Sequence, residues 1–178
     1  MLRQLWRISS KVKNKELKTQ LVHSCILSQI DYCNALYYDL PAKDIKKLQR
    51  LMNASVRFIF NLKFQRVSIT DYLKQAHLLP VNLRIKYKLC ILVFKCINGS
   101  APSYLSSLVS KKVSLPALRI ASDLTLLRVH APSQQNFKNR RFEIAAPPLW
   151  NSLPREIREL TTLIEFKSKL KTYLFLQF

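Results

Sequence analysis

The apolar pattern is most continuous between Leu83 and Ile97, where hydrophobic side chains cover nearly the whole circumference of a helix. Pro80 suits a helix start because it has no N–H to lose, and Gly99, the only glycine, suits a left-handed C-cap. The longest uncharged run in this segment, Leu89–Phe94, is far shorter than the roughly 20 residues of a membrane span. We predict a central helix buried on most sides, with Leu92 and Phe94 in the core.

An amphipathic helix is predicted from about Asn14 to Tyr37. Its apolar residues recur every three or four positions and form one face: Val22, Ile26, Ile30, Cys33 and Tyr37. Pro41 ends it, because the residue before a proline disfavours α geometry. Residues 1–20 are rich in lysine and arginine, and we predict that this segment is too polar to be core.

A second amphipathic helix is predicted over 42–61, with apolar residues on one face: Ile45, Leu48, Met52, Val56 and Ile59. The opposite face carries five cations, Lys43, Lys46, Lys47, Arg50 and Arg57, within an arc of about 100°. Asp44 is the only carboxylate between Pro41 and Phe64, whereas a merely solvated face alternates signs. This pattern favours phosphate contact by the five cations over simple solvation.

Two short helices are predicted next, over 69–77 with Ser68 or Thr70 as N-cap, and over 102–109. Helical periodicity is lost over 110–140, where serine, proline and glutamine mark loops. Within this stretch, residues 124–129 form a candidate extended segment that could pair with the weakly alternating RFEIAA of 141–146 as a short β-hairpin.

The sequence PPLWNSLP then predicts a compact turn, in which Trp150 between prolines is more typical of a packing anchor than of a base-stacking platform. A capping box follows: the Thr162 hydroxyl and the Glu165 carboxylate should each accept a free backbone N–H. The helix after it has an apolar stripe of Leu163, Phe166, Leu170 and Leu174, with Lys167, Lys169 and Lys171 outside.

These elements predict a mainly α fold: a helical domain over 1–109 and an irregular, loop-rich C-terminal subdomain over 110–178 that ends in a helix. A single glycine argues against a turn-rich all-β fold.

The net charge of +20 comes from 30 basic and 10 acidic residues. Such an excess repels itself in a folded chain and favours a polyanionic partner, most commonly nucleic acid. A basic protein without a specific partner is the alternative. A membrane surface is less favoured, because no terminal helix pairs a wide apolar face with an unopposed basic one.

No autonomous active site is predicted. Polymerases and nucleases need clustered carboxylates to hold a metal pair, and here the acids are scattered. The cysteines lack metal-ligand spacing; His23, Cys25 and Cys33 could be imagined as a partial metal site, but buried core thiols are favoured for all four. We expect no metal and no cofactor. The N-terminus lacks the apolar run of a signal peptide, so a nuclear or cytoplasmic location is expected rather than secretion.

Four separated runs resemble one family in its own order: LVHSCILSQIDYCNALYYDLP, IKKLQRLMNASVRFIF, HLLPVNLRIKYKLCILVFKCINGSAPSYLSSLV and APPLWNSLPREIRELTTLIEFKSKLKTYLF. Together they are similar to the region after the catalytic palm in reverse transcriptases of non-LTR retrotransposons, the jockey and CR1-like LINE elements. The resemblance covers about residues 3–175.

The resemblance implies that the helical part is thumb-like, a bundle that grips the template–primer duplex of an RNA-directed DNA polymerase. The family's metal-binding Asp motif would lie before Met1, so a fragment without its own polymerase activity is expected. Thumb helices contact the duplex backbone, and the matching positions are the five cations of the 42–61 helix. The expected partner is an RNA–DNA hybrid or duplex DNA, without base reading.

Two other interpretations stay open at this point. The chain could be a degenerate translated remnant without function. It could instead be a protein-interaction module, in which Trp150, Phe166 and Tyr173 expose an apolar patch that supports self-association.

Overall fold

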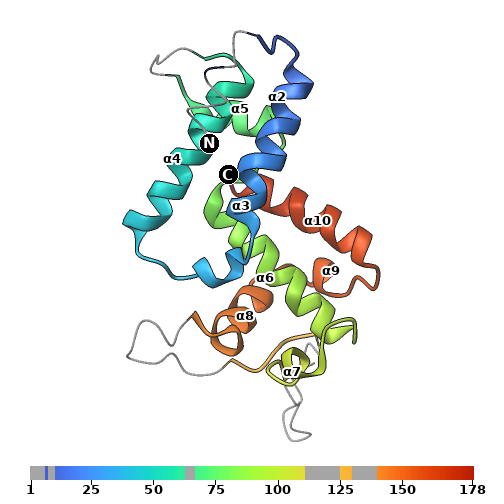
Figure 1. Ribbon diagram of the computed structural model, residues 1–178. Coiled ribbons are helices and arrows are strands. Elements are labelled where there is room, and N and C mark those ends of the chain that lie inside the picture. Colours follow the sequence, from blue (N-terminus) through green and yellow to red (C-terminus); the bar gives the residue numbers. More distant parts are fainter. Residues whose placement is uncertain (1–6, 8–10, 63–66, 111–124, 130–139) are drawn as a thin grey trace, which may run out of the picture. The chain divides into compact units, whose positions relative to one another are not determined.

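The computed structural model describes residue 7 and residues 11–62, 67–110, 125–129 and 140–178. The described chain is mainly helical, as predicted, and contains no extended strand (Figure 1). Its elements are α2 (Lys15–Val22), η1 (His23–Leu27), α3 (Ser28–Asp31), η2 (Asn34–Tyr37), α4 (Ala42–Ile59), α5 (Ile69–Gln75), α6 (Val81–Ile97), α7 (Ser103–Ser106), α8 (Phe142–Asn151), α9 (Arg155–Arg158) and α10 (Leu163–Leu176).

The chain divides into two compact units, Met1–Arg84 with Phe178, and Ile85–Gln177. The division falls inside α6. The boundary predicted near residue 110 rests on lost periodicity and stays a prediction, and most of the loop-rich stretch behind it lies outside the described residues. Within the described ranges, no helix combines the length and apolar character needed to cross a membrane.

The first unit is built around the apolar face of α4. That face packs against α2, the π-helical turn η1 and α5. The predicted core positions of both amphipathic helices are largely confirmed. The buried residues include Val22, Ile26 and Ile30 before the turn, and Met52, Val56 and Ile59 on α4. Ile45 and Leu48, nearer the start of α4, are only half-buried.

The first predicted helix ends early, at Asp31 rather than at Tyr37. Cys33 takes a left-handed conformation with φ of 49°, and a 3-10 turn follows it. The Asp31 carboxylate accepts hydrogen bonds from the Arg84 guanidinium (Nε at 2.8 Å) and from the Asn34 amide at 3.3 Å. The helix ends because Tyr32 is extended, with ψ of 118°, and Cys33 is left-handed, so neither residue continues a right-handed helix. Cys33 is therefore exposed, and its predicted place in the core was wrong.

Lys18 corrects the prediction that residues 1–20 are too polar for the core, since its side chain is only 1% exposed. Its ammonium donates to Asn61 Oδ1 and lies 5.1 Å from the centre of the Phe58 ring. Asn61 follows the end of α4 with φ of 52°. A cation at a helix C-terminus is favoured by the helix dipole, which helps to offset the cost of burying it.

The central helix is confirmed as α6, and it ends in a Schellman motif. Gly99 has φ of +67°, its N–H donates to the Cys96 carbonyl, and the Ser100 N–H donates to the Lys95 carbonyl at 2.9 Å. Burial is less complete than predicted, because Phe94 is buried whereas Leu92 is only half-buried.

The start of α6 has a partner that the sequence did not indicate. Gln49 Oε1, on α4, accepts the backbone N–H of Val81 at 2.9 Å, and Gln49 Nε2 donates to Asn53 Oδ1 at 2.8 Å. Val81 is the first residue of α6, so its N–H has no partner inside the helix. Gln49 thus caps α6 from a neighbouring helix.

We expect Gln49→Ala to lower the free energy of unfolding by about 1 kcal/mol, because it leaves this N–H without an acceptor. Urea denaturation followed by circular dichroism measures the change. Gln49→Glu is the matched control, since it keeps an acceptor oxygen at the same reach. Equal midpoints for the alanine and wild-type chains would show that the cap contributes nothing.

The predicted β-hairpin is wrong, because its second strand is helical: α8 covers Phe142–Asn151. The predicted compact turn is also wrong, because Pro147 and Pro148 lie inside this helix. A proline in a helix interior costs about 3 kcal/mol. Burial of Ala145, Ala146 and Trp150 offsets this cost in the second unit.

The segment 125–129 is held by side chains and by a backbone hydrogen bond from the Arg128 N–H to the Ser110 carbonyl at 2.9 Å. The Asn151 amide pairs with both backbone groups of Leu127, accepting its N–H and donating to its carbonyl, each at 2.9 Å. Trp150 Nε1 donates to the Thr125 carbonyl at 2.8 Å, and Arg158 Nη1 donates to the Thr125 hydroxyl. Trp150 is 1% exposed, which confirms it as a packing anchor.

The last helix, α10, begins after Thr162 as predicted, but the capping box differs in detail. The Thr162 hydroxyl donates to Glu165 Oε2 at 2.8 Å, and neither side chain caps a backbone N–H. The buried stripe is confirmed for Phe166, Leu170 and Leu174.

The Phe166 ring stacks on Phe94, with centroids 4.3 Å apart, and lies 5.7 Å from Trp150. Phe166 and Trp150 are both fully buried and Tyr173 is half-buried. These three residues therefore do not form the exposed apolar patch that the interaction-module interpretation required.

Helix α7 is also shorter than its predicted range of 102–109.

Candidate nucleic-acid interface

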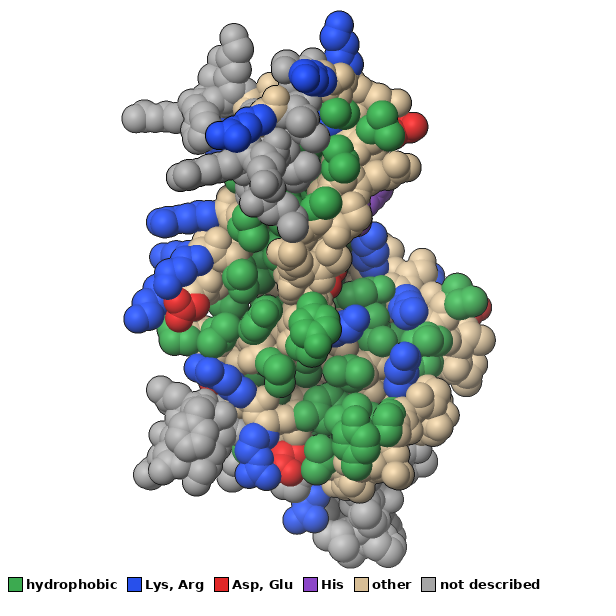
Figure 2. All heavy atoms as spheres, viewed as in Figure 1, with side chains coloured by type: hydrophobic (Ala, Val, Ile, Leu, Met, Phe, Trp, Pro, Cys, Tyr) green, Lys and Arg blue, Asp and Glu red, His purple; other side chains and the backbone are tan. Residues whose placement is uncertain are grey.

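All five predicted contact residues lie on α4, on the side opposite its buried face. Lys43, Lys46, Lys47 and Arg50 are exposed, and Arg57 is half-buried. Figure 2 shows lysine and arginine side chains projecting along this helix at the left of the view, with an acidic patch beside them. The row from Lys43 to Arg57 extends for about 21 Å at 1.5 Å per residue.

The five cations differ in how available they are. Lys47 forms an ion pair with Asp44, with Nζ 2.9 Å from Oδ1, although its side chain stays 71% exposed. Arg57, nearer the end of the helix, already makes an interaction within the protein. Lys43, Lys46 and Arg50 have no ion-pair or hydrogen-bond partner among the described residues. They are the most available members of the row.

The position of Lys43 is not explained by helix stability. It lies in the first turn of α4, where the partial positive charge of the helix dipole disfavours a cation. The first turn also lacks a side-chain cap, since Pro41 is the N-cap residue. Asp44 is the one acid there that suits the dipole. The charge of Lys43 therefore lowers rather than raises the stability of this helix terminus.

Two polar residues on the flank of this row have structural roles. Gln49 caps α6 and bonds Asn53, as described above. The sequence did not predict these structural roles. Two amides four positions apart do not indicate which backbone N–H one of them will bind. The basic row is therefore bordered by amides that are committed to the fold.

Cys90 and Cys96 are buried thiols whose reactivity depends on their surroundings. Burial raises the pKa of the Cys90 thiol to about 12, although nearby Lys86 acts to lower it. Burial also raises the pKa of Cys96, while a hydrogen bond with Ser106 lowers it. Both thiols stay protonated near neutral pH and are poor nucleophiles. Among the described residues, no three His, Cys, Asp or Glu side chains lie close enough to hold a metal ion.

The thiol predictions are thus confirmed for Cys90 and Cys96, which are buried, but not for the exposed Cys33, and Cys25 is half-buried.

Comparison of the chain with protein-family models, with curated proteins and with solved structures finds no match.

Proposed function

We propose that this chain binds the backbone of duplex nucleic acid through the basic row of α4, without reading base sequence. The observation that carries the proposal is the row itself: five cations on one side of an 18-residue helix, with Asp44 as the only acid in that helix. The net charge of +20 supplies long-range attraction to the same partner.

The dimensions of the row suit such a partner. A duplex segment about 21 Å long carries roughly six phosphates on each strand, since the axial spacing is about 3.4 Å per strand. The flexible stems of Lys43, Lys46 and Arg50 can follow these phosphates from one side of the duplex. Lysine and arginine bind phosphate oxygens by charge-assisted hydrogen bonds. Contacts of this kind position a protein on a duplex but carry no sequence information.

The four sequence runs suggest the biological setting. We infer that the chain derives from a non-LTR retrotransposon reverse transcriptase and serves as its thumb-like, duplex-gripping part in the nucleus or cytoplasm. A polymerase must accept every template, so its thumb-like part needs to contact only the backbone of the duplex.

We do not assign catalysis to this chain. Two-metal nucleotidyl transfer needs carboxylates that converge on the metal pair. Several carboxylates here are committed to other partners instead. Four of them form ion pairs: Asp31 with Arg84, Asp44 with Lys47, Glu143 with Arg141, and Glu159 with Arg155. A primer-extension assay with Mg²⁺ or Mn²⁺ should therefore show no incorporation above a no-protein control.

The direct test of binding is fluorescence anisotropy with the full chain. Two unrelated DNA duplexes and one RNA–DNA hybrid of equal length should bind with affinities within a few-fold of each other. The logarithm of the association constant should fall linearly with the logarithm of salt concentration, with a slope of about −0.9 for each phosphate contact on B-form DNA. A strong preference for one DNA sequence, or binding that ignores salt, would contradict the proposal.

A further inference from the structure

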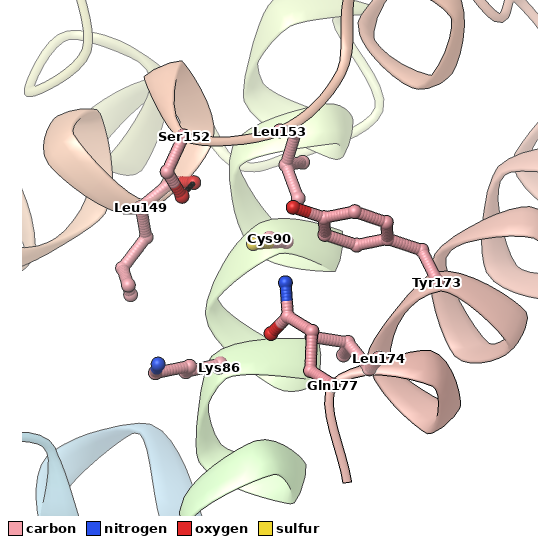
Figure 3. Close-up of a pocket in the computed structure, with 8 residues that line it drawn as sticks. All are labelled: Lys86, Cys90, Leu149, Ser152, Leu153, Tyr173, Leu174 and Gln177. Carbon is pink, nitrogen blue, oxygen red and sulfur yellow. Dashed lines mark hydrogen bonds between the residues drawn. The ribbon is translucent and has the colours of Figure 1, made fainter.

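A small open cavity of about 130 Å³ lies in the second unit, between α6, the end of α8 and α10. Figure 3 shows its lining side chains. Cys90, Leu153 and Leu174 form an apolar floor, and Lys86, Tyr173 and Gln177 stand around it. None of these residues belongs to the basic row of α4.

The floor is suited to a compact apolar group. Cys90, Leu153 and Leu174 are all buried, and the Cys90 thiol is neutral because its pKa is raised to about 12. An apolar cavity of about 150 Å³ in another protein holds a benzene ring. A space of about 130 Å³ with an open side thus has room for one ring or a short branched chain.

Four polar side chains line the cavity, and one of them, the Ser152 hydroxyl, donates to the Leu149 carbonyl at 2.7 Å. The other three also bring hydrogen-bond donors. The Lys86 ammonium has three N–H groups, the Tyr173 phenol has one O–H and the Gln177 amide has an NH₂ group. No hydrogen-bond partner for these three heads occurs among the described residues. In Figure 3 the Gln177 amide lies between Lys86 and Tyr173, with the Tyr173 hydroxyl directed toward the end of α8.

We propose that this cavity binds a small organic carboxylate whose apolar body is one ring or a short branched chain. The ring would lie on Cys90, Leu153 and Leu174. The carboxylate would face Lys86 and the neighbouring donors. A carboxylate only accepts hydrogen bonds, so it complements three donor side chains, and its bond to an ammonium is charge-assisted.

The test is a titration of the isotope-labelled full chain with sodium benzoate at constant ionic strength, followed by amide chemical shifts. Saturable shifts are expected at the amides of Cys90, Leu153 and Gln177. Benzyl alcohol, which lacks the charge, should bind about tenfold more weakly, as expected for the loss of one hydrogen bond to a charged group. Inorganic phosphate, which lacks the apolar body, should give no saturable shift at these amides.

Two variants separate this site from diffuse attraction to a cationic chain. Lys86→Met should weaken benzoate binding about tenfold, whereas Lys88→Met, on an exposed position of the same helix, should leave it unchanged. Ser152→Phe places a ring at the cavity mouth on an exposed residue and should abolish binding while the fold persists. Equal effects of the two lysine variants, or shifts that never saturate, would overturn the proposal.

Discussion

Phe94→Asp is expected to unfold the second unit at room temperature. Phe94 is 2% exposed and its ring stacks on Phe166, which in turn lies against Trp150. The substitution removes this stacking and places a carboxylate in an apolar site without a partner. Burying an unpaired charge costs several kcal/mol, which is comparable with the roughly 5–15 kcal/mol stability of a whole domain. Loss of the near-ultraviolet circular dichroism of Trp150 would report the unfolding.

Lys88→Asp is the matched control, because it places the same carboxylate on an exposed position of α6. Its midpoint should lie within a few degrees of the wild-type chain, as is usual for a surface substitution. Leu92→Asp should fall between the two, since Leu92 is half-buried. Similar melting temperatures for Phe94→Asp and Lys88→Asp would show that α6 is not the core helix of this unit.

Elements whose local signals agree were predictable from the sequence. In α6 the apolar pattern, Pro80 at the start and Gly99 at the end all point to the same boundaries. In α4 the apolar and basic residues fall on opposite sides at one helical period, so both faces could be located. Agreement between propensity, periodicity and capping leaves few alternative structures for such a segment.

Helix α8 could not be predicted, because its local signals oppose its structure. Two consecutive prolines argue for a turn, and RFEIAA alternates like a strand. The helix exists because it buries Trp150 and brings Asn151 to the backbone of Leu127. Those contacts join residues 24 or 25 positions apart. Tertiary packing thus overrides local preference, as it does for many segments of weak propensity.

The candidate interface was predictable in position but not in detail. The five cations of α4 follow from the helical period, and even the Lys47–Asp44 pair is readable from its i,i+3 spacing. The burial of Lys18 was not readable, because it depends on Asn61, 43 positions away in the chain. A charge count therefore overstates how many cations are available to a ligand, and only the folded chain tells which ones are.

The difference between the cations that are counted and those that are available decides which residues the binding experiment should change. Changing Lys43, Lys46 and Arg50 together to Gln should flatten the salt dependence of duplex binding by about two to three slope units, since each phosphate contact contributes about 0.9. The fold should persist, because Met52, Val56 and the rest of the buried face are untouched. The triple change of Lys47, Arg50 and Arg57 to Gln removes the same number of charges from the row. A smaller change in slope is expected for it, because Lys47 is paired with Asp44 and Arg57 interacts within the protein.

The matched control is a second triple variant, Lys167→Gln, Lys169→Gln and Lys171→Gln on α10. These three lysines are also exposed, so both variants remove the same three positive charges from a net charge of +20. Diffuse attraction predicts equal changes in slope for the two variants, whereas contact through α4 predicts a large change only for the first. Circular dichroism of both variants checks that the fold is intact. Equal flattening in two folded variants would exclude α4 as the contact surface and leave net charge alone as the source of binding.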